Sequence, residues 1–84
     1  MIIPPKTNSY WKTLILGEDI PQLHALPTKL LLMRVRLLAR DKTPQKIEEA
    51  IEIAYDFFLK NQSIVQEDIK ILFGAIDQIG ANNE

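Results

Sequence analysis

Two segments of the chain place apolar residues on one side of a helix and charged residues on the other. In residues 44–61 the apolar positions recur every three or four residues. They are Ile47, Ala50, Ile51, Ala54, Phe57 and Phe58, and they lie opposite Glu48, Glu49, Glu52 and Asp56. In residues 64–79 the corresponding apolar positions are Val65, Ile69, Leu72, Ile76 and Ile79, with Phe73 at the edge. Each segment is therefore predicted to be an amphipathic helix with one buried face.

The segment 27–40 also has the spacing of a helix, but its apolar residues fall on two separate sides. The larger side holds Leu31, Leu32, Val35, Leu38 and Ala39, and the smaller patch holds Leu30 and Leu37. Between them runs a strip with Lys29, Met33, Arg36 and Arg40. Burying one leucine side chain is worth about 1.5–3 kcal/mol, so both apolar sides are expected to be covered. The other two helices can cover the larger side.

The cover for Leu30 and Leu37 has two alternatives. One is the N-terminal segment, which offers Trp11, Leu14 and Leu16 and is close in sequence, so docking it costs little entropy. The other is a second copy of the chain. The two alternatives are compatible with each other.

Helix boundaries are indicated by capping residues and prolines. Pro27 suits the first turn of its helix, and Thr43 followed by Pro44 is a start signal for the next one. Ser63 with Gln66 three residues later predicts a capping box for the last helix, and Gly80 a C-terminal cap. Gly74 inside that helix indicates close packing or a break.

Residues 1–26 are predicted to form an N-terminal arm. Pro4 and Pro5 favour extended backbone at its start. The stretch YWKTLIL, residues 10–16, predicts a short helix capped by Asn8 or Ser9 and ended by Gly17. Its aromatic and β-branched content leaves a strand as the alternative. The following loop contains two prolines.

Together these segments predict an all-α fold. The chain has 84 residues, of which 46% are hydrophobic and 25% are charged, as expected of one folded domain. The domain, residues 1–84, is expected to consist of the arm 1–26 and a helical bundle 27–80. Three main helices, at about 27–40, 44–61 and 64–79, form this compact bundle.

The charges are segregated although the net charge is only −1. Residues 29–46 hold six basic residues and one acidic residue, whereas residues 48–84 hold eight acidic and two basic residues. One interpretation is a basic surface for an acidic partner, nucleic acid included. The other is a solvated surface on which Arg40 and Lys42 complement a helix dipole.

A helix-turn-helix interpretation is disfavoured. The second helix of that motif reads DNA with basic or amide side chains near its N-terminus. In the last helix this position holds Glu67 and Asp68, which repel phosphate, and the outer side of the helix 44–61 is acidic.

The sequence offers weak candidates for catalysis or metal binding. His24 is the only histidine and lies in the proline-containing loop near Glu18 and Asp19. The acidic side of residues 44–61 has no histidine and is typical of a solvated surface. Cysteine is absent, as are phosphate-binding glycine loops and nucleophile motifs. We therefore expect neither an enzyme nor a cofactor or metal site.

Location and partner complete the sequence-based hypothesis. The chain has no apolar run of about 18 residues and no signal-peptide pattern, so a cytoplasmic protein without a membrane partner is expected. Tyr10 and Trp11 are candidates for the core or for partner contacts. We expect a non-catalytic interaction or regulatory module that binds an acidic protein surface or itself as a homodimer. The candidate contacts are Lys29, Arg36, Arg40, Leu30, Leu37 and Trp11; the alternative is a DNA-binding regulator that uses residues 29–46.

Overall fold

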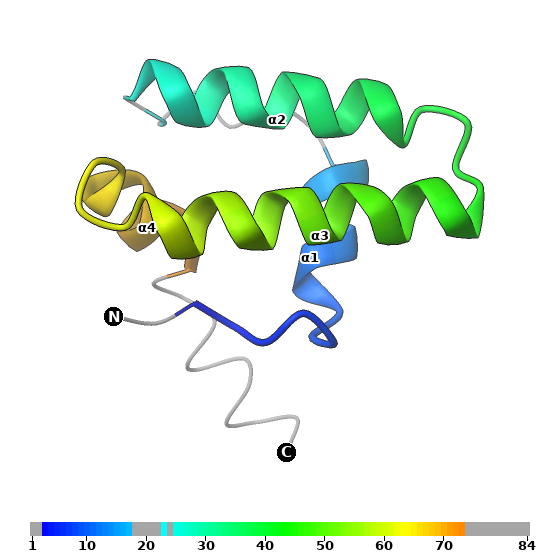
Figure 1. Ribbon diagram of the computed structural model, residues 1–84, viewed down its shortest axis with the longest axis horizontal. Coiled ribbons are helices and arrows are strands. Elements are labelled where there is room, and N and C mark those ends of the chain that lie inside the picture. Colours follow the sequence, from blue (N-terminus) through cyan, green and yellow to red (C-terminus); the bar gives the residue numbers. More distant parts are fainter. Residues whose placement is uncertain (1–2, 18–22, 24, 74–84) are drawn as a thin grey trace.

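Two antiparallel helices lie along each other and a short helix packs against both (Figure 1). The structure, a computed structural model, describes residues 3–17, 23 and 25–73. Its elements are α1 (Tyr10–Leu16), α2 (Leu26–Leu38), α3 (Pro44–Lys60) and α4 (Gln66–Phe73). The predicted all-α fold is confirmed, and residues 10–16 form the helix rather than the strand.

The α2–α3 contact is formed by the faces that the apolar spacing predicted. Leu31, Leu32 and Val35 of α2 are buried. On α3 the alanines Ala50 and Ala54 are fully buried, and such small side chains let two helix backbones approach closely. The larger apolar side of α2 is therefore covered as expected.

Aromatic side chains join α1, α3 and α4. Trp11 of α1 is fully buried, with its ring centre 5.3 Å from that of Phe73 and 6.0 Å from that of Phe58. Phe58 and Phe73 meet edge to face at 5.3 Å, a favoured geometry for aromatic pairs. The indole N–H of Trp11 donates to the carbonyl oxygen of Pro4 at 3.0 Å, which fixes the N-terminal arm to this cluster.

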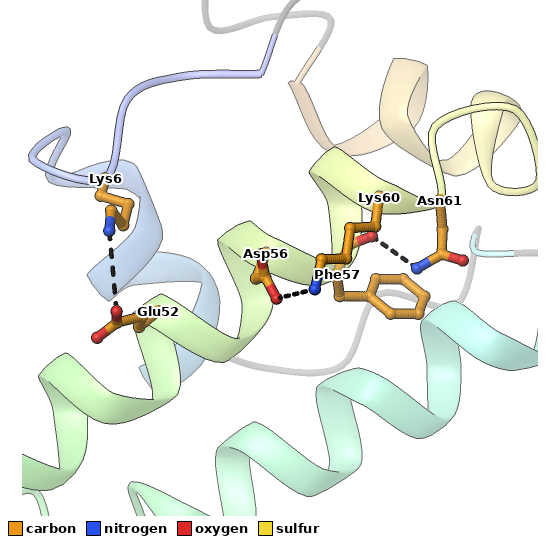
Figure 2. Close-up of polar contacts among 6 residues, drawn as sticks. All are labelled: Lys6, Glu52, Asp56, Phe57, Lys60 and Asn61. Atoms are coloured by element: carbon orange, nitrogen blue, oxygen red, sulfur yellow. Dashed lines mark hydrogen bonds and ion pairs between the residues drawn. The ribbon is translucent and has the colours of Figure 1, made fainter.

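The helix ends agree in part with the capping residues. The side-chain oxygen of Asn8 accepts a hydrogen bond from the backbone N–H of Tyr10 at 2.8 Å, so Asn8 rather than Ser9 caps α1. Thr43 precedes α3 and Pro44 begins it as predicted, but the Thr43 side chain makes no capping hydrogen bond. At the other end of α3, the Asn61 side chain donates to the carbonyl oxygen of Phe57 at 2.9 Å (Figure 2).

The predicted capping box of the last helix is wrong. Helix α4 begins at Gln66, and Ser63 lies in the preceding turn. The backbone N–H groups of Ile64 and Val65 both donate to the carbonyl oxygen of Asn61, so the chain turns before the helix starts. This turn buries Val65 in the core, an arrangement that local capping chemistry does not encode. The predicted end of this helix, with Gly74 and Gly80, lies outside the described residues.

Candidate protein-interaction surface

Helix α2 exposes a second apolar face to solvent. Four large side chains on this face are 53–66% exposed: Leu26, Leu30, Met33 and Leu37, here called the α2 stripe. Their spacing of four, three and four residues keeps them within an arc of about 60°, because each helical residue advances by about 100°. The buried residues of α2 lie on the opposite side of the helix.

Sequence reasoning identified only half of this face. The sequence predicts Leu30 and Leu37 as a patch, but it places Met33 in the basic strip and Leu26 in the loop before the helix. The alternating spacing of four and three residues is the signal that joins all four. This spacing becomes decisive only with the structure, in which all four side chains are more than half exposed.

Residues 3–17, the part of the N-terminal segment that the structure describes without a gap, leave Leu30 and Leu37 53% and 66% exposed, so the predicted cover by Trp11, Leu14 and Leu16 is wrong. Trp11 and Leu14 turn into the core, where they are 0% and 3% exposed. The reason is that α3 and α4 offer Trp11 a larger apolar contact, through Phe58 and Phe73, than the narrow patch on α2 does. Trp11 is thus a core residue and is not accessible to a partner.

Basic residues flank the α2 stripe on both sides. Lys29 and Arg36 lie along one side and Arg34 along the other, as their positions on the helix require. Lys29 and Arg34 are exposed, and so is Arg40, which lies just beyond the end of α2. Within Leu26–Leu38 every charged residue is basic.

Arg36 differs from the other basic candidates because it joins two helices. Its Nη2 and Nε donate to the carbonyl oxygen of Leu14 at 3.1 and 3.4 Å. Leu14 lies in the last turn of α1, where backbone carbonyls carry partial negative charge. Arg36 therefore stabilises the contact of α2 with α1 as well as bordering the stripe.

The outer side of α3 carries the acidic residues as a solvated surface. Asp56 pairs with Lys60 at 3.0 Å, and Glu52 lies 4.0 Å from Lys6 of the arm (Figure 2). All four of these side chains are more than half exposed, so each pair contributes little to stability. Among residues 3–17, 23 and 25–73, no group of three or more histidine, aspartate or glutamate side chains is arranged to hold a metal ion.

The first turn of α4 buries one of its two acidic residues and exposes the other, Glu67. Asp68, in its first turn, is fully buried and accepts a hydrogen bond from the backbone N–H of Ala25 at 2.9 Å. This places the start of α4 against the start of α2, so that Asp68 is not available to a nucleic-acid groove. The other sequence candidate, His24, lies outside the described residues, as do Glu18 and Asp19.

Two further observations concern membranes and relatives. None of the helices in the described part of the chain combines the length and the apolarity needed to cross a bilayer. Comparison with protein-family models, with curated proteins and with solved structures finds no significant match to this chain.

Proposed function

We propose that this chain is a non-catalytic interaction module that binds a protein partner through the α2 stripe. The observation that carries the proposal is the exposure of four large apolar side chains on one face of a helix whose other face is in the core. Contiguous apolar patches of this kind are typical of protein interaction sites.

The energy of covering the stripe supports the same proposal. Fully burying a leucine or methionine side chain is worth about 1.5–3 kcal/mol, so covering the remaining half of each is worth about 1 kcal/mol. Four such side chains in one row give a partner a substantial gain, whereas scattered exposed leucines need no explanation. Met33 in the middle adds an unbranched side chain that adapts to the shape of a partner.

The test compares two matched double variants. Leu30→Ser with Leu37→Ser removes the centre of the stripe, and Leu59→Ser with Ile64→Ser removes two other exposed apolar side chains. All four side chains are 46–66% exposed, so each substitution in either variant should lower the free energy of unfolding by a similar amount, about 1 kcal/mol. Proteins retained from native cell extract by the wild type should be lost with the first variant and kept with the second. Equal retention by both variants would contradict the proposal.

Self-association through the α2 stripe is a second candidate, favoured by the same exposed leucines. Light scattering after size exclusion distinguishes the two. A dimer that forms as concentration rises, and that Leu30→Ser with Leu37→Ser abolishes, would support self-association. A monomer throughout a wide concentration range would exclude it.

DNA binding through residues 29–46 remains the alternative from a different class. The exposed side chains of Lys29 and Arg40 favour DNA binding. The α2 stripe argues against it, because apolar side chains form neither hydrogen bonds nor ion pairs with phosphates. Lys29→Glu with Arg40→Glu tests it without disturbing Arg36. Loss of duplex retention at moderate salt in this variant would support DNA binding, and no retention of the wild type at low salt would end it.

A further inference from the structure

The spacing of the α2 stripe is that of a coiled-coil seam. Steps of four, three and four residues place its members alternately at the d and a positions of a heptad, with Leu26 and Met33 at d and Leu30 and Leu37 at a. The seam spans twelve residues, and its first and last members lie about 16 Å apart along the helix axis at a rise of 1.5 Å per residue. A partner helix of about three turns matches this length.

The residues beside the seam define the charge that a partner helix must carry. Lys29 and Arg36 occupy g positions and Arg34 occupies an e position. Residues at e and g of paired helices face one another and select the partner through their charges. Lys29 and Arg34 are exposed, whereas Arg36 already donates to the carbonyl oxygen of Leu14. The side chains that face Lys29 and Arg34 must therefore be acidic for the pair to be favourable.

A second copy of the chain lacks this complementarity. If two α2 helices pair in antiparallel fashion, g positions face g positions, and in a parallel pair g positions face e positions. Both arrangements bring Lys29, Arg34 and Arg36 of one copy close to those of the other. The α3 helix of a second copy has acidic side chains but cannot serve as the partner of α2. The only large apolar side chain exposed on α3 is Leu59, so α3 offers no apolar row to pair with the α2 stripe.

A membrane surface fits the stripe less well than a helix does. Helices that lie in a bilayer interface have a wide apolar face, commonly with aromatic anchors, whereas an apolar row restricted to a and d positions is typical of helix pairing. The α2 stripe spans an arc of only about 60° and has no aromatic member.

We infer that the α2 stripe binds an amphipathic helix of another protein, with leucine-like residues at a and d and glutamate or aspartate at e and g. This inference rests on the proposed function and adds the chemistry of the partner. The contact is small, so the complex is expected to be transient, with a dissociation constant in the micromolar range or weaker, on the order of 10⁻⁶–10⁻⁴ M.

Two synthetic peptides of three heptads test the inference. Both have leucine at a and d; one has glutamate at e and g, and the other has lysine there. Two copies of the same peptide carry like charges at e and g and repel each other, so neither peptide readily self-associates. Binding to the full chain is followed by fluorescence anisotropy at low and at moderate salt.

The expected result is that the glutamate peptide binds at least tenfold more tightly than the lysine peptide, and that salt narrows the difference. Leu30→Ser with Leu37→Ser should abolish binding. Lys29→Glu should weaken binding of the glutamate peptide and strengthen binding of the lysine peptide. Lys12→Glu, a charge change at an exposed position of α1, should alter the binding of neither peptide.

Three results would overturn the inference and separate it from the proposed function. Equal binding of both peptides would remove the acidic requirement and leave the α2 stripe as a protein-binding surface. A dimer abolished by the double serine variant, with neither peptide bound, would identify a second copy as the occupant. Binding of the wild type to vesicles of equal phosphatidylcholine and phosphatidylserine, lost in the same variant and with neither peptide bound, would assign the stripe to membranes and overturn the proposed function as well.

Discussion

The buried carboxylate of Asp68 holds the backbone N–H of Ala25, 43 residues earlier in the chain, at 2.9 Å. Ala25 immediately precedes α2, so an acidic side chain of α4 stabilises the positive end of another helix. This contact joins α4 to the start of the helix that carries the α2 stripe.

Replacement of Asp68 is expected to destabilise the fold. Asp68→Ala leaves the N–H of Ala25 without its acceptor and should cost about 1–3 kcal/mol, whereas Asp68→Asn keeps an acceptor oxygen and should cost less. Urea unfolding measures both. Glu67→Ala is the control, because Glu67 is exposed and only pairs with Lys70 at 3.8 Å. Similar losses at positions 67 and 68 would show that the Ala25 contact is not a significant source of stability.

Thr28 is expected to be a site where a substitution stabilises the protein. Its side chain is fully buried, and its hydroxyl oxygen has no hydrogen-bond partner among the described residues. Thr28→Val keeps the shape of the side chain and removes the cost of burying the hydroxyl. The free energy of unfolding should therefore rise by about 1 kcal/mol. Thr28→Ser keeps the hydroxyl but loses the methyl group and should destabilise. A lower melting temperature for the valine variant would refute this explanation.

Arg36 is expected to act on stability, unlike the other basic residues of α2. Arg36→Gln removes the charged donor to the Leu14 carbonyl and should cost about 1.5 kcal/mol, since hydrogen bonds to charged groups are worth about 1.5–3 kcal/mol when fully formed. Lys29→Gln should change the free energy of unfolding by about 0.5 kcal/mol or less. Chemical denaturation of both variants decides this. If they are equally stable, the contact between Arg36 and α1 does not hold the two helices together.

Gly17 is expected to resist replacement by any residue with a Cβ. Its backbone is extended, so a left-handed conformation is not the reason; a Cβ built there lies 2.6 Å from the carbonyl oxygen of Thr13. Gly17→Ala should therefore shift the end of α1 and destabilise by about 1–3 kcal/mol. Lys12→Ala, at an exposed position of the same helix, should have little effect. Unchanged stability of Gly17→Ala, by thermal unfolding, would mean that the turn relaxes without cost.

Tyr10 is expected to make stability fall at alkaline pH. Burial raises the pKa of its phenol above the usual value of 10.0, because the charged phenolate is poorly solvated there. The contribution of the neutral phenol is present in full below pH 10 and is lost as pH rises through the higher pKa of the folded state. The phenol also donates a hydrogen bond to the carbonyl oxygen of Leu72, which a phenolate cannot do.

Tyr10→Phe separates this effect from other alkaline transitions. The variant should be less stable than the wild type at neutral pH, and the difference should shrink above pH 10. Urea midpoints measured from pH 8 to pH 11.5 give the comparison. Parallel curves for the two proteins would show that ionisation of Tyr10 is not linked to folding.

Much of the secondary structure could be predicted because helices obey a local rule. The spacing of Leu31 and Val35 fixed the buried side of α2, and that of Ala50 and Ala54 fixed the buried side of α3. Pro44 marked the start of α3, since a proline at that position costs no hydrogen bond. The start of α4 was missed because burial of Val65, rather than the hydroxyl of Ser63, determines the turn before it.

The spacing of apolar residues along α2 is sufficient to predict that this helix has two apolar sides. Which of the two sides stays in solvent depends on how the helices pack against one another. That outcome depends on Trp11 finding Phe58 and Phe73, and on Arg36 reaching the carbonyl of Leu14, contacts between residues far apart in the chain. The periodicity of a single helix contains no information about its neighbours, because burial is a competition among all the faces that the folded chain brings together.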